Sequence, residues 1–268
     1  MFTVGVAARV IYLATLRFLT EVEFQMGLLL VVTSGKGGAG KSTVSVGLAS
    51  AFSKLNKSVL LIDFDEGLRC LDLMLNVSDK LIFDLSDVIC RGKSTDEVAL
   101  KIDNNIKLIA APQKAGEVGR RELGEFLSTA TDENDVVILD CPAGIEPELY
   151  KNLPRFSHVL VVASLDFIGC RSASALNELF IQNGLKHSGL IVNKFDYFTL
   201  KNSLALSLDD IVNSAGLPLC GIVPLDTDLQ SLIAKGKLYK KCRAAYAFSR
   251  IANRLQCGNS PLPKLNRI

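Results

Sequence analysis

The segment from Gly35 to Thr43 constrains the fold more than any other part of the sequence. It reads Gly-Lys-Gly-Gly-Ala-Gly-Lys-Ser-Thr and contains the full Walker A pattern, Gly-x-x-x-x-Gly-Lys-Ser. An apolar run, Leu28–Thr33, precedes the pattern, and a helical pattern follows it. This context predicts a strand, a tight glycine-rich loop and a helix whose N-terminus faces a bound phosphate.

The residue types in this loop predict Mg·ATP as the ligand. Glycines let successive backbone N–H groups converge on phosphate oxygens, and the positive end of the following helix adds to the attraction. Lys41 is expected to reach the β- and γ-phosphates, and the Ser42 hydroxyl to bind Mg²⁺. The expected nucleotide-binding residues of the loop are Gly35, Lys36, Gly37, Gly38, Ala39, Gly40, Lys41, Ser42 and Thr43.

Short apolar runs alternate with longer helical stretches after Met26. The runs are mostly continuous, as in strands that are buried on both faces of a parallel sheet. The expected strands are Leu28–Thr33, Val59–Asp63, Ile106–Ala110, Val136–Asp140, Val159–Ala163, Leu190–Asn193 and Leu219–Val223. The expected helices are Lys41–Leu55, Glu122–Thr131, Ser172–Gln182, Leu208–Ser214 and Lys241–Gln256, with short helices over Leu68–Arg91. This order predicts an α/β fold with a doubly wound, mostly parallel sheet of about seven strands and helices on both faces.

The composition is typical of an ordered globular protein, and it argues against nucleic-acid binding and against a fold built on disulfides or zinc. Apolar residues make up 49% of the 268 residues and charged residues 22%. A net charge of +2 gives no strong electrostatic case for nucleic acid, so no nucleic-acid partner is expected. The seven cysteines are odd in number and contain no Cys-x-x-Cys pair, which argues against a disulfide framework or a zinc ribbon.

We expect the ATPase domain to span residues 26–257, with an extension before it and a tail after it. Residues 1–25 are apolar but interrupted by charges, and lack the features of a signal peptide. They are expected to be an extension outside the fold, with an amphipathic membrane-surface helix as the alternative. Residues 258–268 contain two prolines and are expected to be a short surface tail.

Three carboxylates follow predicted strands at the edge where the phosphates should lie. Asp63 and Asp65 stand at i and i+2 beyond one strand, and Asp140 closes another as in a Walker B motif. Asp65 is expected to orient the attacking water, and Asp140 to bind Mg²⁺. Asp63 is expected to support Mg²⁺ through water or to hold the loop, with a simple capping role as the alternative.

Three segments together resemble the MinD/ParA family of deviant Walker A ATPases. The first is the phosphate loop with its additional lysine, Lys36. The others are Asp63–Leu75, which is similar to the MinD pattern D-F-D-x-G-L-R-N-L-D-L, and Asp140–Glu146, which is similar to D-x-P-A-G-I-E. Cys70 departs from the pattern, which commonly has asparagine there. The resemblance implies an ATP-dependent homodimer in which Lys36 reaches the partner's nucleotide.

The resemblance also implies an adenine site. Asn193 would hydrogen-bond the base, and Pro224 would pack near it. The run Asn193-Lys194-Phe195-Asp196 also matches the Asn-Lys-x-Asp motif of GTPases, in which Asp196 would select guanine. Adenine is preferred because the additional lysine and the two carboxylate segments match the ATPase family.

By resemblance, the chain is expected to be an ATPase that acts as a dimeric switch in bacterial division-site placement. Its expected partners are a division inhibitor and an ATPase activator. Its expected location is the cytoplasm, with a peripheral position on the inner face of the cell membrane as the alternative. The alternatives are a regulator of flagellar number, an Mrp-type iron–sulfur carrier, a DNA-segregating ParA-type protein and a non-enzymatic binding module. The missing Cys-x-x-Cys pair disfavours the iron–sulfur carrier, and the low net charge disfavours the DNA-segregating protein.

Overall fold

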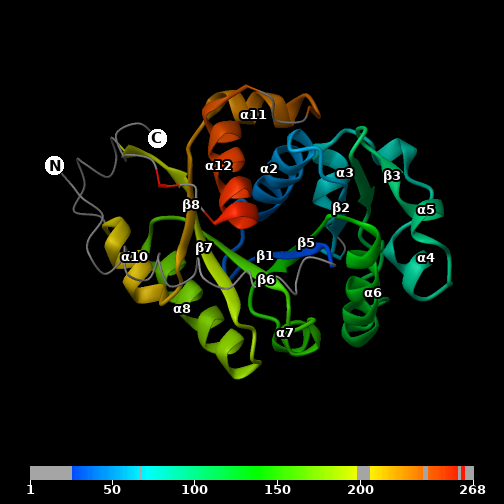
Figure 1. Ribbon diagram of the computed structural model, residues 1–268, viewed down its shortest axis with the longest axis horizontal. Helices are drawn as coiled ribbons and strands as arrows, with labels where there is room; N and C mark the ends of the chain where they lie inside the picture. The colour runs from blue at the N-terminus through cyan, green and yellow to red at the C-terminus, as the bar shows by residue number, and fades with distance from the viewer. Residues whose placement is uncertain (1–25, 67, 198–205, 238–240, 259–260, 263–268) are drawn as a thin grey trace.

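The computed structural model describes residues 26–66, 68–197, 206–237, 241–258 and 261–262. In the described residues one sheet of eight strands runs through the molecule in the order β3-β4-β2-β5-β1-β6-β7-β8 (Figure 1). The strands are β1 (Leu28–Ser34), β2 (Val59–Asp63), β3 (Leu100–Lys101), β4 (Ile106–Ile109), β5 (Val136–Ala143), β6 (His158–Ala163), β7 (His187–Phe195) and β8 (Leu219–Pro224). The helices are α2 (Lys41–Lys54), α3 (Cys70–Met74), η2 (Ser78–Lys80), α4 (Leu85–Ile89), α5 (Thr95–Val98), α6 (Arg120–Glu133), α7 (Pro147–Asn152), α8 (Phe167–Gln182), α10 (Leu208–Ala215), α11 (Thr227–Ala234) and α12 (Arg243–Cys257).

The predicted doubly wound fold is confirmed. All seven predicted strands are present and pair in parallel, as strands joined by crossover helices must. The eighth strand, β3, was not predicted. It contains two residues and pairs antiparallel with β4 at the edge of the sheet, so it is too short to leave a period in the sequence.

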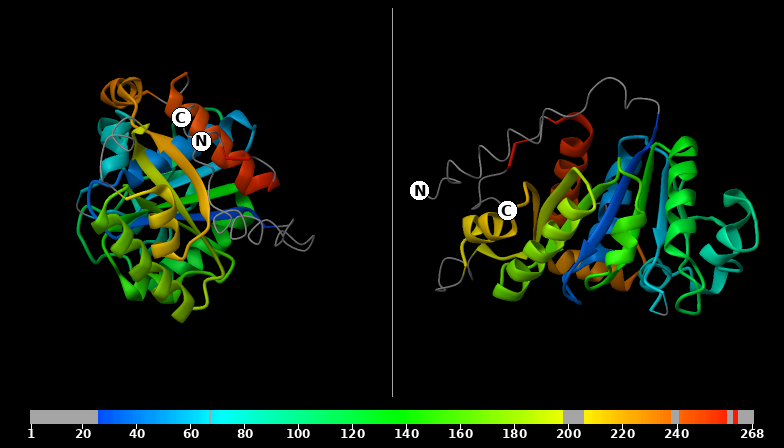
Figure 2. Two further views of the ribbon diagram at one scale, coloured as in Figure 1. Left: turned by 90° about the vertical axis from the view of Figure 1, so that its left-hand side faces the viewer. Right: turned by 90° about the horizontal axis from the view of Figure 1, so that it is seen from below.

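Two cores form because neighbouring residues of a buried strand point to opposite faces of the sheet. In β1, Leu29 and Val31 join one core, while Leu30 and Val32 join the other. Figure 1 shows α2, α11 and α12 on one face, and α6, α7, α8 and α10 on the other. The end-on and lower views show the same sandwich of helices around a twisted sheet (Figure 2).

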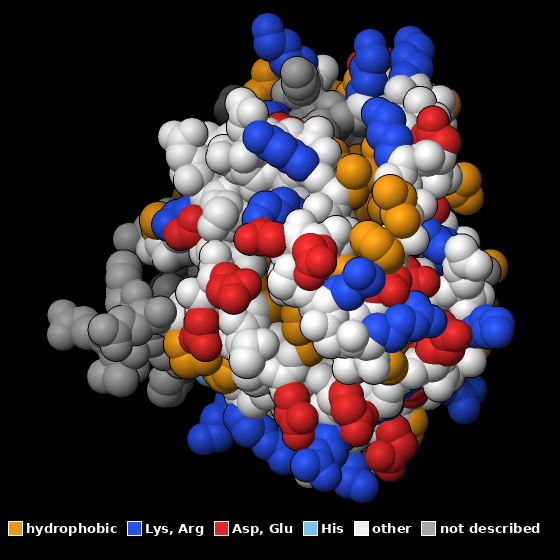
Figure 3. Space-filling model, turned by 90° about the vertical axis from the view of Figure 1, so that its right-hand side faces the viewer, with side chains coloured by type: hydrophobic (Ala, Val, Ile, Leu, Met, Phe, Trp, Pro, Cys, Tyr) orange, Lys and Arg blue, Asp and Glu red, His pale blue; other side chains and the backbone are white. Residues whose placement is uncertain are grey.

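The described residues begin at Met26, and the last of them is Leu262. Residues 1–25 and most of the expected tail lie outside the described residues, so neither expectation for them is tested. No helix in the described part of the chain is long and apolar enough to cross a membrane. Acidic and basic side chains are interspersed over the face that Figure 3 presents, at the β3 end of the sheet.

Candidate nucleotide site

The phosphate loop leaves β1 at its carboxyl end and closes on the N-terminus of α2. Gly38 and Gly40 have φ angles of 76° and 94°, which L-amino acids with a side chain rarely adopt. Gly40 is the N-cap of α2 and provides no side chain to cap it. The first-turn amide groups of the helix therefore remain available to an anion in the loop.

Lys41 is the first residue of α2 and is largely buried (7% exposed). It lies close enough to Asp65, Asp140 and Cys70 for its positive charge to oppose the rise in pKa that burial causes in each of these groups. A buried ammonium close to two carboxylates suits a ligand that brings both negative charge and a metal ion. The fold thus brings Lys41 close to Asp65 and Asp140, which are 24 and 99 residues away in the sequence.

Asp140 presents one buried carboxylate oxygen that could bind Mg²⁺. It is fully buried, and its Oδ1 accepts a hydrogen bond from Ser45 Oγ at 2.8 Å. Its Oδ2 has no hydrogen-bond partner among the described residues, which is costly for a buried carboxylate. Burial raises the pKa of Asp140 to about 7, although hydrogen bonding from Ser42 opposes the change. A cation beside Oδ2 would remove this cost, so the residues fit Mg²⁺.

The described residues contain no group of three or more His, Cys, Asp or Glu side chains able to hold a metal ion unaided. Mg²⁺ commonly takes only one or two protein ligands and completes its shell with water and substrate phosphates. Ser42 and Asp140 would supply such a minimal set.

Both carboxylate oxygens of Asp63 accept hydrogen bonds from backbone amides. Oδ1 accepts from the Asp65 amide at 2.9 Å, and Oδ2 from the Leu71 amide at 3.0 Å. Asp63 pairs in register with Asp140 on the neighbouring strand, so the two carboxylates are adjacent. Burial is the main cause that raises the pKa of Asp63 to about 6. These contacts favour the loop-holding alternative for Asp63 over water-mediated binding of Mg²⁺.

Asp65 lies just beyond Asp63 and is 8% exposed. Burial raises its pKa, and the charge of Lys41 opposes that change. Cys70 occupies the position where the resembling family has asparagine, and its pKa is raised by burial and by Asp63, Asp65 and Asp140. At this position, close to three aspartate side chains, the chain therefore has a thiol where the pattern has an amide.

The structure gives Lys36 a partner that the sequence did not indicate. Its Nζ lies 3.0 Å from Asp166 Oδ2, and both side chains are 38% exposed. Asp166 is the N-cap of α8 and also accepts from the Gly169 amide at 2.7 Å and from Ser164 Oγ. Lys36 and Asp166 are separated by 130 residues, so only the fold brings them together.

Asn193 and Lys194 support the phosphate loop from β7. Asn193 Nδ2 donates to Ala39 O, and Lys194 Nζ donates to Gly38 O, each at 2.8 Å. A Cβ at Gly40 would lie 2.2 Å from Asn193 Nδ2, so only glycine fits there. Pro224 ends the neighbouring strand β8 in register with Phe195. Sequence reasoning missed the contacts of the Asn193 and Lys194 side chains with the phosphate loop.

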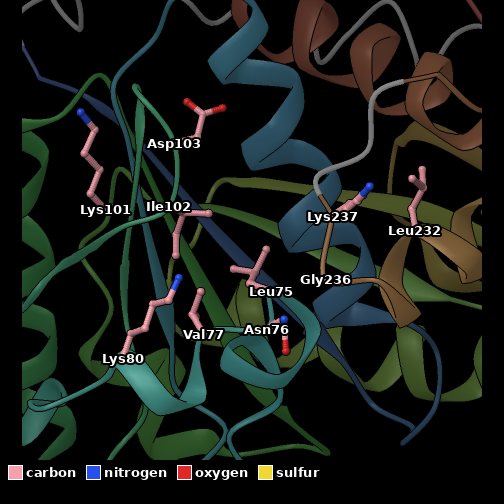
Figure 4. A pocket seen from close by; sticks show the side chains of 10 residues that line it. All are labelled: Leu75, Asn76, Val77, Lys80, Lys101, Ile102, Asp103, Leu232, Gly236 and Lys237. Carbon is pink, nitrogen blue, oxygen red and sulfur yellow. The ribbon is translucent and has the colours of Figure 1, made fainter.

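A pocket of about 660 Å³ lies elsewhere, between the end of α3 and the end of α11 (Figure 4). The side chains of Leu75, Val77 and Ile102 gather in its middle. Its lining residues are Leu75, Asn76, Val77, Lys80, Lys101, Ile102, Asp103, Leu232, Gly236 and Lys237. None of them belongs to the phosphate loop, so this pocket is separate from the nucleotide site.

The family model and similar curated proteins indicate the same family. Residues 30–239 match the model of the CobQ/CobB/MinD/ParA nucleotide binding domain. The septum site-determining protein MinD of Bacillus subtilis is 33% identical over 251 residues, which cover 90% of this chain and 93% of that protein. The MinD protein of Synechocystis is 30% identical over 244 residues, covering 88% and 92%.

Solved structures agree with these relatives. A chain of the MinC:MinD cell division protein complex of Aquifex aeolicus superposes with a TM-score of 0.80 at 26% identity, covering 89% of this chain and 99% of that one. MinD of Pyrococcus horikoshii, solved with Mg-ADP, shares the fold with a TM-score of 0.74 at 20% identity, covering 86% and 96%. The chain therefore belongs to the CobQ/CobB/MinD/ParA family of nucleotide-binding proteins, in the branch of the septum site-determining MinD proteins.

Proposed function

We propose that this protein is a slow ATPase that dimerises with Mg·ATP and acts as a switch in division-site placement. The observation that carries the proposal is the combination of a two-lysine phosphate loop with the Oδ2 of buried Asp140, which lacks a partner within the described residues. Mg²⁺ supplies charge neutralisation and orientation of the phosphates when it is bound.

Each residue of the site has a separate role in the proposed phosphoryl transfer. The backbone of residues 35–43 holds the phosphates, Lys41 neutralises their charge, and Ser42 and Asp140 hold Mg²⁺. Asp65 orients the attacking water, and Asp63 keeps the Asp65 loop in position through its two backbone hydrogen bonds. Phosphoryl transfer depends mainly on such positioning and charge stabilisation rather than on a strong base.

Adenine is the proposed base. Asn193 lies near the carboxyl end of β7 and contacts the phosphate loop at Ala39. Pro224 is the last residue of β8, the strand that pairs with β7. The amide oxygen of Asn193 can face a base while its nitrogen holds Ala39.

Exposed apolar side chains around the loop support the dimer. Leu68, Ile145, Phe167 and Ile168 follow the carboxyl ends of β2, β5 and β6 and are 47–75% exposed. Apolar side chains gathered at one edge are typical of a surface that a partner covers. We propose that a second copy covers it, and that Lys36 then exchanges Asp166 for the partner's nucleotide.

The proposed protein partners are inferred from similar proteins and not from particular residues of this chain. One similar solved structure is titled as a MinC:MinD complex, so we propose a MinC-type division inhibitor as a partner, together with an activating protein. Attachment of the dimer to a membrane surface is a further part of the proposed switch, and the liposome experiment below tests it.

The test measures mass and membrane binding in the presence of ATP, ADP or no nucleotide, with Mg²⁺. We expect a dimer by light scattering only with ATP or a non-hydrolysable analogue. Sedimentation with anionic liposomes should follow the same nucleotide dependence, and a chain starting at Met26 shows whether residues 1–25 contribute. Identical mass and identical sedimentation under all nucleotide conditions would contradict the switch.

A further inference from the structure

Arg120, the first residue of α6, bridges the loops that follow β2 and β5. Its Nε donates to Glu146, and its two terminal nitrogens lie 3.4 Å from the two oxygens of Glu66. Its guanidinium also covers the ring of Phe64, with 4.5 Å between Cζ and the ring centroid. Thus one side chain contacts residues of both loops at the phosphate end of the sheet.

Both loops carry residues of the proposed mechanism. Glu66 directly follows Asp65, and the buried Phe64 separates Asp65 from Asp63. Glu146 lies two residues after Gly144, whose amide donates to Ser34 O at 2.9 Å beside the phosphate loop. The Arg120 bridge therefore connects the water-orienting segment to the segment beside the phosphates.

The contacts are too buried to be incidental surface pairs. The side chains of Arg120, Glu66 and Glu146 are 22%, 8% and 32% exposed. Glu66 also accepts from the Gly116 amide at 3.0 Å, which fixes its orientation. Removing one partner of such a group leaves a poorly solvated charge, which costs more than the loss of a surface ion pair.

Arginine suits this place for a geometric reason. Its rigid, planar guanidinium directs separate N–H groups toward two carboxylates, whereas lysine presents a single compact charge. Without the guanidinium, Glu66 and Glu146 would lose the cation that contacts both of them.

We propose that Arg120 is a positioning residue that makes the loops around Glu66 and Glu146 move as one unit. Its effect on hydrolysis rests on the proposed function, whereas the coupling of the two loops does not. Nucleotide affinity, which depends mainly on residues 35–43, is largely independent of the bridge.

The first test follows amide hydrogen exchange of the two loops in the nucleotide-free full chain. Glu146→Gln weakens one arm of the bridge, and we expect faster exchange around Glu66 as well as around position 146 itself. In the Arg120→Gln background the same change should leave exchange around Glu66 unaltered. Arg121→Gln is the control, because Arg121 pairs only with exposed Glu125 on the same helix among the contacts described for it. An effect of Glu146→Gln confined to its own loop would overturn the coupling.

The second test measures turnover and nucleotide affinity separately. We expect Arg120→Gln to lower kcat about tenfold, since small misplacements of reacting groups cost this much or more. The dissociation constant for Mg·ATP should change less than about twofold, and Arg121→Gln should behave like the wild type. An unchanged kcat in a folded Arg120→Gln protein would refute the positioning role. Absence of turnover in the wild type would instead count against the proposed ATPase and leave the exchange result standing.

Discussion

Three aspartates near the phosphate loop show how partners give one residue type different tasks. Asp63 uses both oxygens to hold backbone amides, so it stabilises a loop. Asp140 keeps one oxygen unpartnered within the described residues and is suited to a metal ion. Asp65 is buried close to Lys41 and is the remaining candidate to contact water.

Asp65→Ala is expected to abolish hydrolysis while nucleotide binding and dimerisation persist. The carboxylate positions the water in the transition state, and such groups typically contribute about 10²- to 10⁴-fold to the rate. Phosphate release measured beside equilibrium nucleotide binding separates the two effects. Asp79→Ala, on the exposed η2 segment, is the matched control. Turnover retained in Asp65→Ala would refute the assigned role.

Asp166→Asn is expected to favour the ATP-bound dimer. Asparagine caps α8 as well as aspartate does, so the helix keeps its cap while Lys36 loses its ionic partner. A half-exposed pair of this kind contributes about 0.2–1 kcal/mol, and each of the two protomers loses one pair, so the dimer should form at roughly two- to thirtyfold lower protein concentration. Analytical ultracentrifugation with a non-hydrolysable analogue measures the shift. A weaker dimer would mean that Asp166 assists association instead of holding Lys36 back.

At the scale of elements, α2 and α12 pack together at a glycine. A Cβ added to Gly47 would lie 2.4–2.6 Å from ring carbons of Phe248, which is itself buried. The close contact of these helices keeps α2, and with it the phosphate loop, against the sheet.

Gly47→Ala is therefore expected to destabilise the protein by about 1–3 kcal/mol, even though alanine favours a helix. Urea denaturation measures the change in the free energy of unfolding. Phe248→Leu should recover part of the loss in the double variant, and Ser53→Ala on the same helix is the control. An increase in stability for Gly47→Ala would show that Phe248 can move aside.

Strands β6 and β7 bring two histidines together. His158 and His187 pair in register and stack with their ring centroids 4.7 Å apart. Burial, aided by the charge of His187, lowers the pKa of His158 from its usual 6.5 to about 4. Between these two pH values the unfolded chain binds more protons at this residue than the folded chain, so acidification removes stability.

We expect His158→Phe to lessen the loss of stability between pH 6.5 and pH 4, by up to about 3 kcal/mol. Asp63 and Asp140 have raised pKa values and contribute slopes of the opposite sign, so the quantity to compare is the difference between variant and wild type. Urea denaturation at several pH values gives this difference. A difference that does not change with pH would contradict the lowered pKa.

At the scale of the whole molecule, the sequence predicted what is local and periodic. The seven buried strands left continuous apolar runs, and the phosphate loop left a fixed spacing of glycines and lysines. The short α7 and α11 and the two-residue β3 were not predicted, because their patterns are too brief to separate from loops.

Side-chain contacts between residues far apart in the sequence could not be predicted either. Lys36 with Asp166 and Arg120 with Glu66 join residues 130 and 54 positions apart, and no local pattern indicates either pair. The contact of Asn193 with Ala39 likewise depends on the position of β7 in the sheet, where β6 alone separates it from β1. The residue types of the site were thus predictable, but their partners were not.

The most direct test of the account is titration calorimetry of the full chain with ATP and with GTP, in the presence and absence of Mg²⁺. We predict saturable binding of Mg·ATP in preference to Mg·GTP. Lys41→Ala should weaken the binding of Mg·ATP about 100-fold or more, because a charge-assisted contact worth about 3 kcal/mol is lost. Wild-type protein that binds no adenine nucleotide with Mg²⁺, or a Lys41→Ala variant that binds it equally well, would contradict the account.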